Sequence, residues 1–111
     1  MQDKVVLCGA SAYEEKFYLN EGFISLPNQV KEELKIMCVL YTQEIGGVIM
    51  LEYHADGTLT LRTEALENDY QYDEIASTLK IGELQREKKT LFEELELYYK
   101  MVFLGQKYEE K

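Results

Sequence analysis

Few side chains in this sequence have the chemistry that a catalytic site needs. Cys8 and His54, the single histidine, would form a thiol nucleophile and its general base if the fold brought them together. Their separation along the chain neither favours nor excludes this pairing, and a buried cysteine that only fills space is the commoner case. Cys38 lies inside the apolar run 36–41, so its context indicates packing. A catalytic or metal-binding role for His54 needs a second converging group, and the sequence shows none.

Carboxylates are abundant, but their spacing is not specific. Glu32, Glu33, Asp69 and Asp73 offer oxygen ligands without the spacing of a metal-binding motif. The sequence also lacks a P-loop, a G-x-G-x-x-G turn, a G-x-S-x-G elbow and an H-E-x-x-H helix. We therefore expect no catalytic residue, no metal site and no cofactor, and the sequence leans away from an enzyme.

The overall composition indicates one acidic domain. A length of 111 residues suits a single domain over 1–111, with a frayed tail at 105–111. The net charge of −9 argues against nucleic acid and anionic membranes as partners. No apolar stretch approaches the roughly 20 residues of a membrane span. The N-terminus does not have the pattern of a signal peptide, and two cysteines without framework spacing indicate reduced thiols, so we expect a cytoplasmic protein.

The negative charge is concentrated in the middle of the chain. Residues 48–80 contain seven acidic and two basic residues. A solvated face that keeps a small protein soluble would explain this excess. A docking surface for a basic protein partner would explain it as well.

A hairpin at about 47–54 and 58–65 would position His54. The Asp56-Gly57 pair suits a two-residue type I′ turn, but that register mixes polar and apolar side chains on both faces. A three-residue loop with a left-handed Gly57 makes one face almost wholly apolar, pairing Tyr53 with Leu59, Leu51 with Leu61 and Ile49 with Thr63. We expect this second register. It leaves His54 on the opposite face, near Thr58 and alongside Glu52 and Arg62.

A helix is expected at about 28–45, between Pro27 and the Gly46-Gly47 pair. Apolar residues recur there at helical spacing: Val30, Leu34, Met37, Tyr41 and Ile45. A buried strand at 36–42 is the rival interpretation, and the periodicity upstream favours the helix. The segment 12–19 stays ambiguous, because a capping box predicts a helix there and an alternating pattern predicts a strand.

The acidic segment after the hairpin joins it to the last helix, with Asn68, Asp69 or Asp73 as the cap. Because tyrosine supplies a large contact area at low entropic cost, the same segment suits a recognition loop. The candidate interaction surface comprises Glu52, His54, Glu67, Asp69, Tyr70, Tyr72 and Asp73.

The C-terminal helix is expected at about 72–104, with a break at Gly82 if it is interrupted. Two apolar stripes follow it, which is more than one packing seam needs. The stripes either pack within one subunit or serve self-association through Leu84, Leu91, Phe92, Leu95, Tyr98, Tyr99, Val102 and Phe103. Together these elements predict an α+β fold, in which a small antiparallel sheet packs against two helical segments.

Two long runs, LKIMCVLYTQEIGG and LKIGELQREKKTLFEELELYYKMVFLG, resemble a family of small uncharacterised acidic proteins from anaerobic Gram-positive bacteria. With the Tyr-rich N-terminal stretch, the resemblance covers nearly the whole chain. It implies a single-domain fold in the bacterial cytoplasm and supplies no known activity. The order helix, Gly-Gly, strand, Asp-Gly turn, strand, helix is also similar to the first half of roadblock-type scaffold domains, which form dimers. The chain departs from that pattern after residue 80, and fold alone does not fix function.

Two functional hypotheses follow. The first is a non-enzymatic protein-interaction module that self-associates through its helices as a homodimer and presents an acidic, Tyr-bearing surface at 48–80. Its partner would be an unidentified, basic protein. The alternative is a small-molecule-binding protein or enzyme, with a tyrosine-lined pocket between the sheet and the helices.

Overall fold

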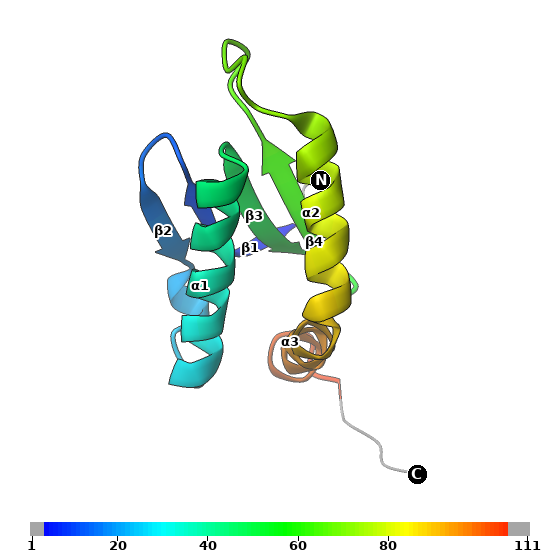
Figure 1. Cartoon of the computed structure of the whole chain (residues 1–111). Coiled ribbons are helices and arrows are strands. Elements are labelled where there is room, and N and C mark those ends of the chain that lie inside the picture. The colour runs from blue at the N-terminus through cyan, green and yellow to red at the C-terminus, as the bar shows by residue number, and fades with distance from the viewer. Residues whose placement is uncertain (1–3, 107–111) are drawn as a thin grey trace.

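A four-stranded antiparallel sheet forms the base of the fold in the computed structural model, which describes residues 4–106 (Figure 1). Its strands lie in the order β2-β1-β3-β4. The helices lie on one side of the sheet, toward the viewer in Figure 1. We call that side the inner face and the other the outer face. The α+β fold predicted from the sequence is therefore confirmed.

The central hairpin has the register that the sequence predicts. β3 (Val48–Tyr53) and β4 (Leu59–Glu64) flank a three-residue loop, closed by a 2.8 Å hydrogen bond from His54 N to Thr58 O. Gly57 has the left-handed backbone, φ 92°, that such a loop favours. The register pairs Tyr53 with Leu59, Leu51 with Leu61 and Ile49 with Thr63. The two-residue turn is excluded, and each strand is one residue shorter at either end than expected.

The ambiguous N-terminal segment forms a second hairpin. β1 (Val5–Ser11) pairs with β2 (Lys16–Leu19), so the helical interpretation of 12–19 is wrong. Phe17 lies opposite Ala10 and Leu19 opposite Cys8, which places the alternating apolar residues on the inner face. The capping-box serine instead stabilises the turn, where Ser11 Oγ accepts a 3.3 Å hydrogen bond from Glu14 N.

The first long helix is confirmed. After a short 3₁₀ turn, η1 (Glu21–Phe23), α1 (Asn28–Glu44) crosses the inner face, and the strand interpretation of 36–42 is wrong. Its core-facing residues are Leu34, Met37, Cys38 and Tyr41. The apolar run at 36–41 surrounds the helix, so Ile36 and Leu40 point away from the core and are exposed.

The C-terminal helix divides at Lys88, and the expected break at Gly82 is wrong. α2 (Glu74–Glu87) contains Gly82 within its length, and α3 (Lys89–Val102) follows after one non-helical residue. α3 is seen nearly end-on beneath α2 in Figure 1, so the chain turns sharply between them. This turn brings Leu91, Leu95 and Tyr99 back to the core, which a continuation of α2 would carry away from the sheet. The expected frayed tail at 105–111 lies largely outside the described residues.

The core fills the space between the inner face and all three helices. Its fully buried members include Leu7, Cys8, Phe23, Leu34, Cys38, Tyr41, Ile49, Leu51 and Tyr53. The helices also contribute the buried residues Leu84, Leu91, Phe92, Leu95 and Tyr99. Tyr53 links the two layers, because its hydroxyl donates a 2.8 Å hydrogen bond to Leu95 O in α3.

The Gly46-Gly47 pair gives a matched test of the link between α1 and β3. Both glycines have left-handed backbones, with φ of 94° and 67°. A Cβ on Gly46 would meet open space, but on Gly47 it would lie 2.6 Å from Glu64 O and 2.7 Å from the Tyr72 ring. Gly47→Ala should therefore lower the free energy of unfolding by about 1–3 kcal/mol more than Gly46→Ala, because overpacking adds to the shared backbone strain. Urea denaturation measures both; equal losses would show that Gly47 is not tightly packed.

Candidate functional site

The histidine and the cysteines lie on opposite faces of the sheet. His54 continues the outer face, where its Nε2 lies 3.0 Å from Thr60 Oγ1. Cys8 and Cys38 are completely buried on the inner side. The hydrogen bond with Cys38, together with burial, raises the pKa of the Cys8 thiol far above its ordinary value. The structure therefore does not form the thiol–imidazole pair considered from the sequence, and the Cys8 thiol stays protonated.

Glu52 is the exception among the residues expected on the interaction surface. It lies on the outer face, yet only 4% of it is exposed. Arg62 donates to Glu52 Oε2 from Nη2 at 2.9 Å and from Nε at 3.1 Å, and also pairs with Glu64. Glu52 Oε1 is buried without a hydrogen-bond partner in the described part of the chain. This carboxylate is held by the sheet and does not form an accessible docking group.

The acidic segment between β4 and α2 is an ordered loop that projects at the top of Figure 1. Tyr13, from the β1–β2 turn, donates a 2.6 Å hydrogen bond to Asp69 Oδ2 and accepts one from Leu66 N at 3.0 Å. Tyr70, at the loop, is 91% exposed. The loop that contains these carboxylates is therefore hydrogen-bonded to the β1–β2 turn through Tyr13.

Asp73 is the cap of α2 among the three candidates that the sequence offered. Its Oδ1 accepts hydrogen bonds from Ile75 N at 2.9 Å and Ala76 N at 3.1 Å. The carboxylates of Asp69 and Asp73 thus accept hydrogen bonds that stabilise the loop and the helix start. Glu67 is exposed to solvent. Glu74 is also exposed, in the first turn of α2.

A cluster of hydroxyl groups lies beneath this loop. Tyr41 OH is 2.8 Å from Ser77 Oγ and 3.0 Å from Tyr72 OH, and Tyr72 OH donates to Ser77 Oγ at 2.8 Å. Burial, the largest effect, raises the pKa of Tyr41 to about 12. Burial also acts to raise the pKa of Tyr72, but hydrogen bonds with Ser77, Tyr41 and Thr63 outweigh it and lower that pKa. We call Tyr41, Tyr72 and Ser77 the hydroxyl cluster; sequence reasoning placed Tyr72 on the surface and missed it.

The loop and the hydroxyl cluster enclose a polar cleft of about 550 Å³. Glu64, Glu67, Asp69 and Glu74 line it, and Tyr72 and Ser77 contribute hydroxyl groups. Among the described residues that line it there is no lysine or arginine. We call it the acidic cleft. Its lining can accept hydrogen bonds from, and attract, a cationic group.

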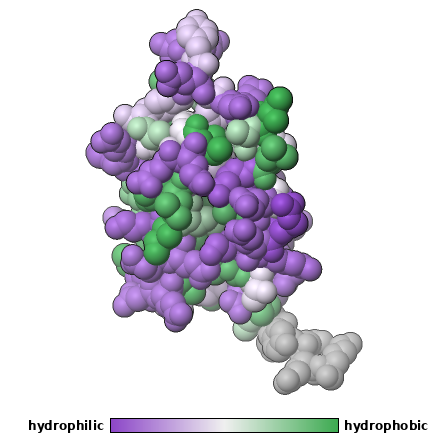
Figure 2. All heavy atoms as spheres, in the orientation of Figure 1, coloured by the Kyte–Doolittle hydropathy of each residue, from purple (hydrophilic) through white to green (hydrophobic). Residues whose placement is uncertain are grey.

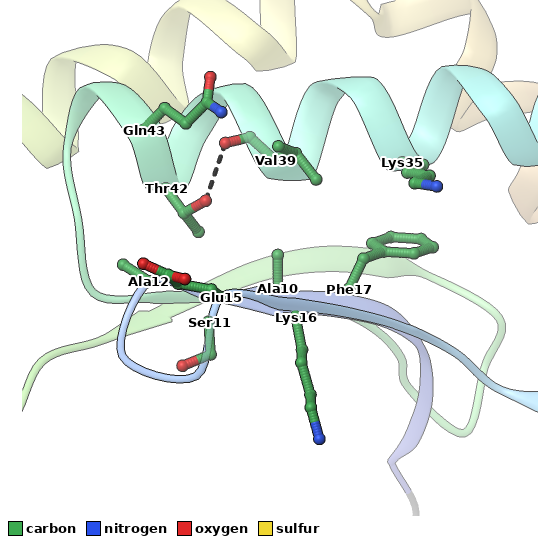
Figure 3. Close-up of a pocket in the computed structure, with 10 residues that line it drawn as sticks. All are labelled: Ala10, Ser11, Ala12, Glu15, Lys16, Phe17, Lys35, Val39, Thr42 and Gln43. Carbon is green, nitrogen blue, oxygen red and sulfur yellow. Dashed lines mark hydrogen bonds between the residues drawn. The ribbon is translucent and has the colours of Figure 1, made fainter.

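A second cleft, of about 760 Å³, separates α1 from the β1–β2 hairpin (Figure 3). Figure 3 shows Val39 and Thr42 of α1 facing Ala10 and Phe17 across the gap, while Lys16 points away from it. Its lining includes neither tyrosine, histidine nor cysteine within residues 4–106. It therefore differs from the tyrosine-lined pocket that the alternative hypothesis expected.

The residues expected to mediate self-association are divided between the core and the surface. Leu84, Leu91, Phe92, Leu95 and Tyr99 are buried within the chain itself. Tyr98 is partly buried, with its hydroxyl 3.2 Å from Ser25 Oγ. Only Val102 and Phe103 of this set are exposed. Most of both stripes thus packs within one subunit.

Within 4–106, no group of three or more histidine, cysteine, aspartate or glutamate side chains is placed to hold a metal ion. None of the helices in the same range is long and apolar enough to cross a membrane.

The model of a known protein family matches most of the chain. Residues 4–107 match the model of a family described as a family of unknown function, DUF6145. No curated protein and no solved structure matches the chain.

The Glu52–Arg62 pair predicts an asymmetric response to substitution. Arg62→Ala leaves a buried carboxylate without its partner and should cost about 2–3 kcal/mol of unfolding free energy, less than a fully buried pair because Arg62 is partly exposed. Adding Glu52→Gln to this variant should restore part of the loss. Glu64→Ala, which removes the exposed partner of Arg62, should cost less than about 1 kcal/mol. Chemical denaturation of the four proteins checks this, and no recovery in the double variant would contradict the assignment.

The hydroxyl cluster predicts a pH-dependent stability. Because the folded-state pKa of Tyr41 is raised to about 12, its contribution is complete below the unfolded value near 10 and is lost as the pH rises toward 12. Tyr41→Phe should lower the unfolding free energy by about 1 kcal/mol at pH 8, and its deficit should shrink between pH 9 and 12. Tyr18→Phe, on the outer face, is the control and should show neither effect. A deficit independent of pH would refute the shifted ionisation.

Proposed function

We propose that this chain, which belongs to the DUF6145 family of unknown function, is a non-enzymatic protein-interaction module. Its working surface would be the loop 65–73 with the acidic cleft beneath it. The observation that carries the proposal is a cleft lined by four carboxylates, of which only Glu64 forms an ion pair with a basic residue, Arg62, and by no basic side chain among its described lining residues. The ligand that fits this chemistry is a lysine- or arginine-bearing segment of a partner protein.

The loop supports this proposal because it is held in place before any partner arrives. Tyr13 fixes it through Asp69 and Leu66, and Asp73 fixes its end through the cap of α2. A preorganised surface loses less conformational entropy on binding than a mobile one. Tyr70 adds a large exposed side chain beside the carboxylates, as contact surfaces commonly have.

Within the cleft, a cationic side chain would meet two kinds of acceptor. Glu67 and Glu74 supply carboxylates from the rim, while the hydroxyl cluster supplies neutral oxygen atoms from Tyr72 and Ser77. A guanidinium has five donors in a fixed plane and would use both kinds at once. We therefore expect arginine to bind more tightly than lysine.

We also propose a cellular setting and an oligomeric contact for this protein. A bacterial, cytoplasmic setting with reduced thiols suits two free, buried cysteines. Of the residues expected to mediate a homodimer, Val102 and Phe103 at the end of α3 are exposed and available for such a contact, whereas most of the others belong to the core.

The alternative function, small-molecule binding or catalysis, has one observation in its favour. The cleft in Figure 3 has a size common among ligand sites, and apolar side chains line both of its walls, with Val39 on one side and Ala10 and Phe17 on the other. It lacks the expected tyrosines, and Thr42 Oγ1 already bonds to Val39 O of its own helix at 2.8 Å. We rank it second because no converging set of catalytic groups accompanies it.

A labelled arginine-rich peptide tests the proposed function directly. The charge-reversed variant is Glu67→Lys/Glu74→Lys, chosen because Asp69 and Asp73 have structural hydrogen bonds that a substitution would break. We expect the variant to bind the peptide about ten-fold more weakly, a loss of about 1.4 kcal/mol. Fluorescence anisotropy at low ionic strength measures this, and the affinity of the unmodified protein should fall with added salt.

The matched control is Glu21→Lys/Glu94→Lys, which changes the net charge equally at exposed sites on other elements. If both double variants lose affinity to the same degree, attraction is a property of the whole acidic surface and the acidic cleft is not a site. A glutamate-rich peptide that binds as well as the arginine-rich one would also contradict the proposal.

A further inference from the structure

An apolar groove of about 540 Å³ runs between α1 and α2, away from the acidic cleft. Its floor consists of Ile36, Met37 and Leu40 from α1 and Leu84 from α2. We call it the helix groove. Figure 2 shows hydrophobic surface over the middle of α1, framed by hydrophilic side chains. The two helices run in opposite directions along its sides (Figure 1).

Two large apolar side chains of the helix groove are exposed to solvent. Ile36 is 51% exposed and Leu40 is 50% exposed, although neighbouring Met37 and Leu84 are buried. Ile36 and Leu40 are four residues apart, so they stand one above the other on the same face of α1. Covering both side chains would remove apolar surface from water, which favours binding.

Ion pairs link α1 to Lys80 of α2 and to Lys88, the residue that follows α2. Lys80 of α2 lies 2.7 Å from Glu44 Oε1 and 3.0 Å from Glu83 Oε1. Lys88 lies 3.1 Å from Glu33 Oε2 of α1. These pairs neutralise both lysines of the groove and link α1 to Lys80 and Lys88.

The rim of the groove is left acidic once these pairs are formed. Glu32 and Glu87 also line it, and no ion pair is found for either in residues 4–106. Among the residues that line the groove there are three glutamates, Glu32, Glu33 and Glu87, and two lysines, an excess of one negative charge. Because both lysines are already paired, Glu32 and Glu87 remain available to a partner. The apolar floor and the acidic rim together define the chemistry of what fits.

We propose that the helix groove binds an amphipathic α-helix of a partner protein, with apolar side chains at i, i+3 or i+4, and i+7 and with lysine or arginine on both flanks. The apolar stripe of such a helix would cover Ile36 and Leu40, and its basic flanks would face Glu32 on α1 and Glu87 on α2. A third helix laid between two antiparallel helices completes a common packing arrangement.

A second copy of this chain fits the groove less well. Its own exposed stripe on α1, Ile36 and Leu40, has Glu32 on one flank and the already paired Glu33 and Glu44 on the other, so it does not offer basic side chains on both flanks to Glu32 and Glu87 of the groove. Charge complementarity therefore selects a basic helix from another protein.

The inference shares with the proposed function only the premise that the chain binds proteins. The helix groove and the acidic cleft have no lining residue in common. Substitutions in one leave the other intact, so the two proposals succeed or fail separately.

The test uses a synthetic helix of about 18 residues with leucines at i, i+3, i+4 and i+7 and lysines beside them. Two control peptides have the same composition with the leucines moved off the stripe, or glutamate in place of every lysine. Titration against the ¹⁵N-labelled full chain should shift backbone amides in 29–40 and 80–88, and neither control should do so. Ile36→Ser/Leu40→Ser should weaken binding at least ten-fold, and Glu32→Lys/Glu87→Lys about three- to ten-fold.

Leu79→Ser is the matched control, because Leu79 is exposed on α2 but does not line the groove. It should leave the affinity unchanged, and circular dichroism should show that every variant is folded. Equal binding of the peptide with displaced leucines, an equal loss in Leu79→Ser, or shifts confined to 65–73 would overturn the proposal. A dimer of the free protein that dissociates in Ile36→Ser/Leu40→Ser would overturn it in favour of a second copy.

Discussion

The aromatic stack on Tyr53 is the contact on which the rest of the structure depends. The Tyr53 ring stacks on both Phe23, at a centroid distance of 5.6 Å, and Tyr99, at 4.1 Å, and these two rings also contact each other at 6.3 Å. The Tyr53 hydroxyl donates to Leu95 O. The stack therefore joins the central strand to the segment before α1 and to the last helix. It also fixes which face of β3 is buried, because a shift of one residue would turn Tyr53 toward water. Burial raises the pKa of Tyr53 well above its ordinary value, so the hydroxyl stays a donor.

This one constraint separates the groups from which a catalytic site would be built. With Tyr53 turned inward, Glu52 and His54 face outward, where they bond to Arg62 and Thr60. The two thiols remain buried on the inner side of the sheet, away from His54. Acidic side chains are concentrated on and beneath the loop before α2. Exposed apolar side chains lie in the helix groove between α1 and α2. The two surfaces that we propose for contact with a basic protein therefore lie away from Cys8, Cys38 and His54.

The parts that were predictable from the sequence are those that local periodicity decides. Alternation around Gly57 predicted the hairpin register, and helical spacing from Val30 onward predicted α1. The turn at Lys88 escaped prediction because every residue around it suits a helix, and the cause is the burial of α3 against distant strands. The sequence did not predict the hydroxyl cluster or the burial of Glu52 either. Each depends on contacts between side chains from separate elements, which the periodicity within a single element does not predict.

Photo-crosslinking in the native cell tests most directly the claim that this fold presents its working surfaces on the loop and the helices. A photoreactive phenylalanine analogue would replace Leu40, Tyr70 or Tyr18 in turn, since all three are exposed and Tyr18 lies on the outer face of the sheet. The account predicts crosslinks from positions 40 and 70 to lysine- or arginine-rich segments of a partner protein, and none from position 18. Crosslinks from position 18 alone, or products whose attached segments are acidic, would contradict it.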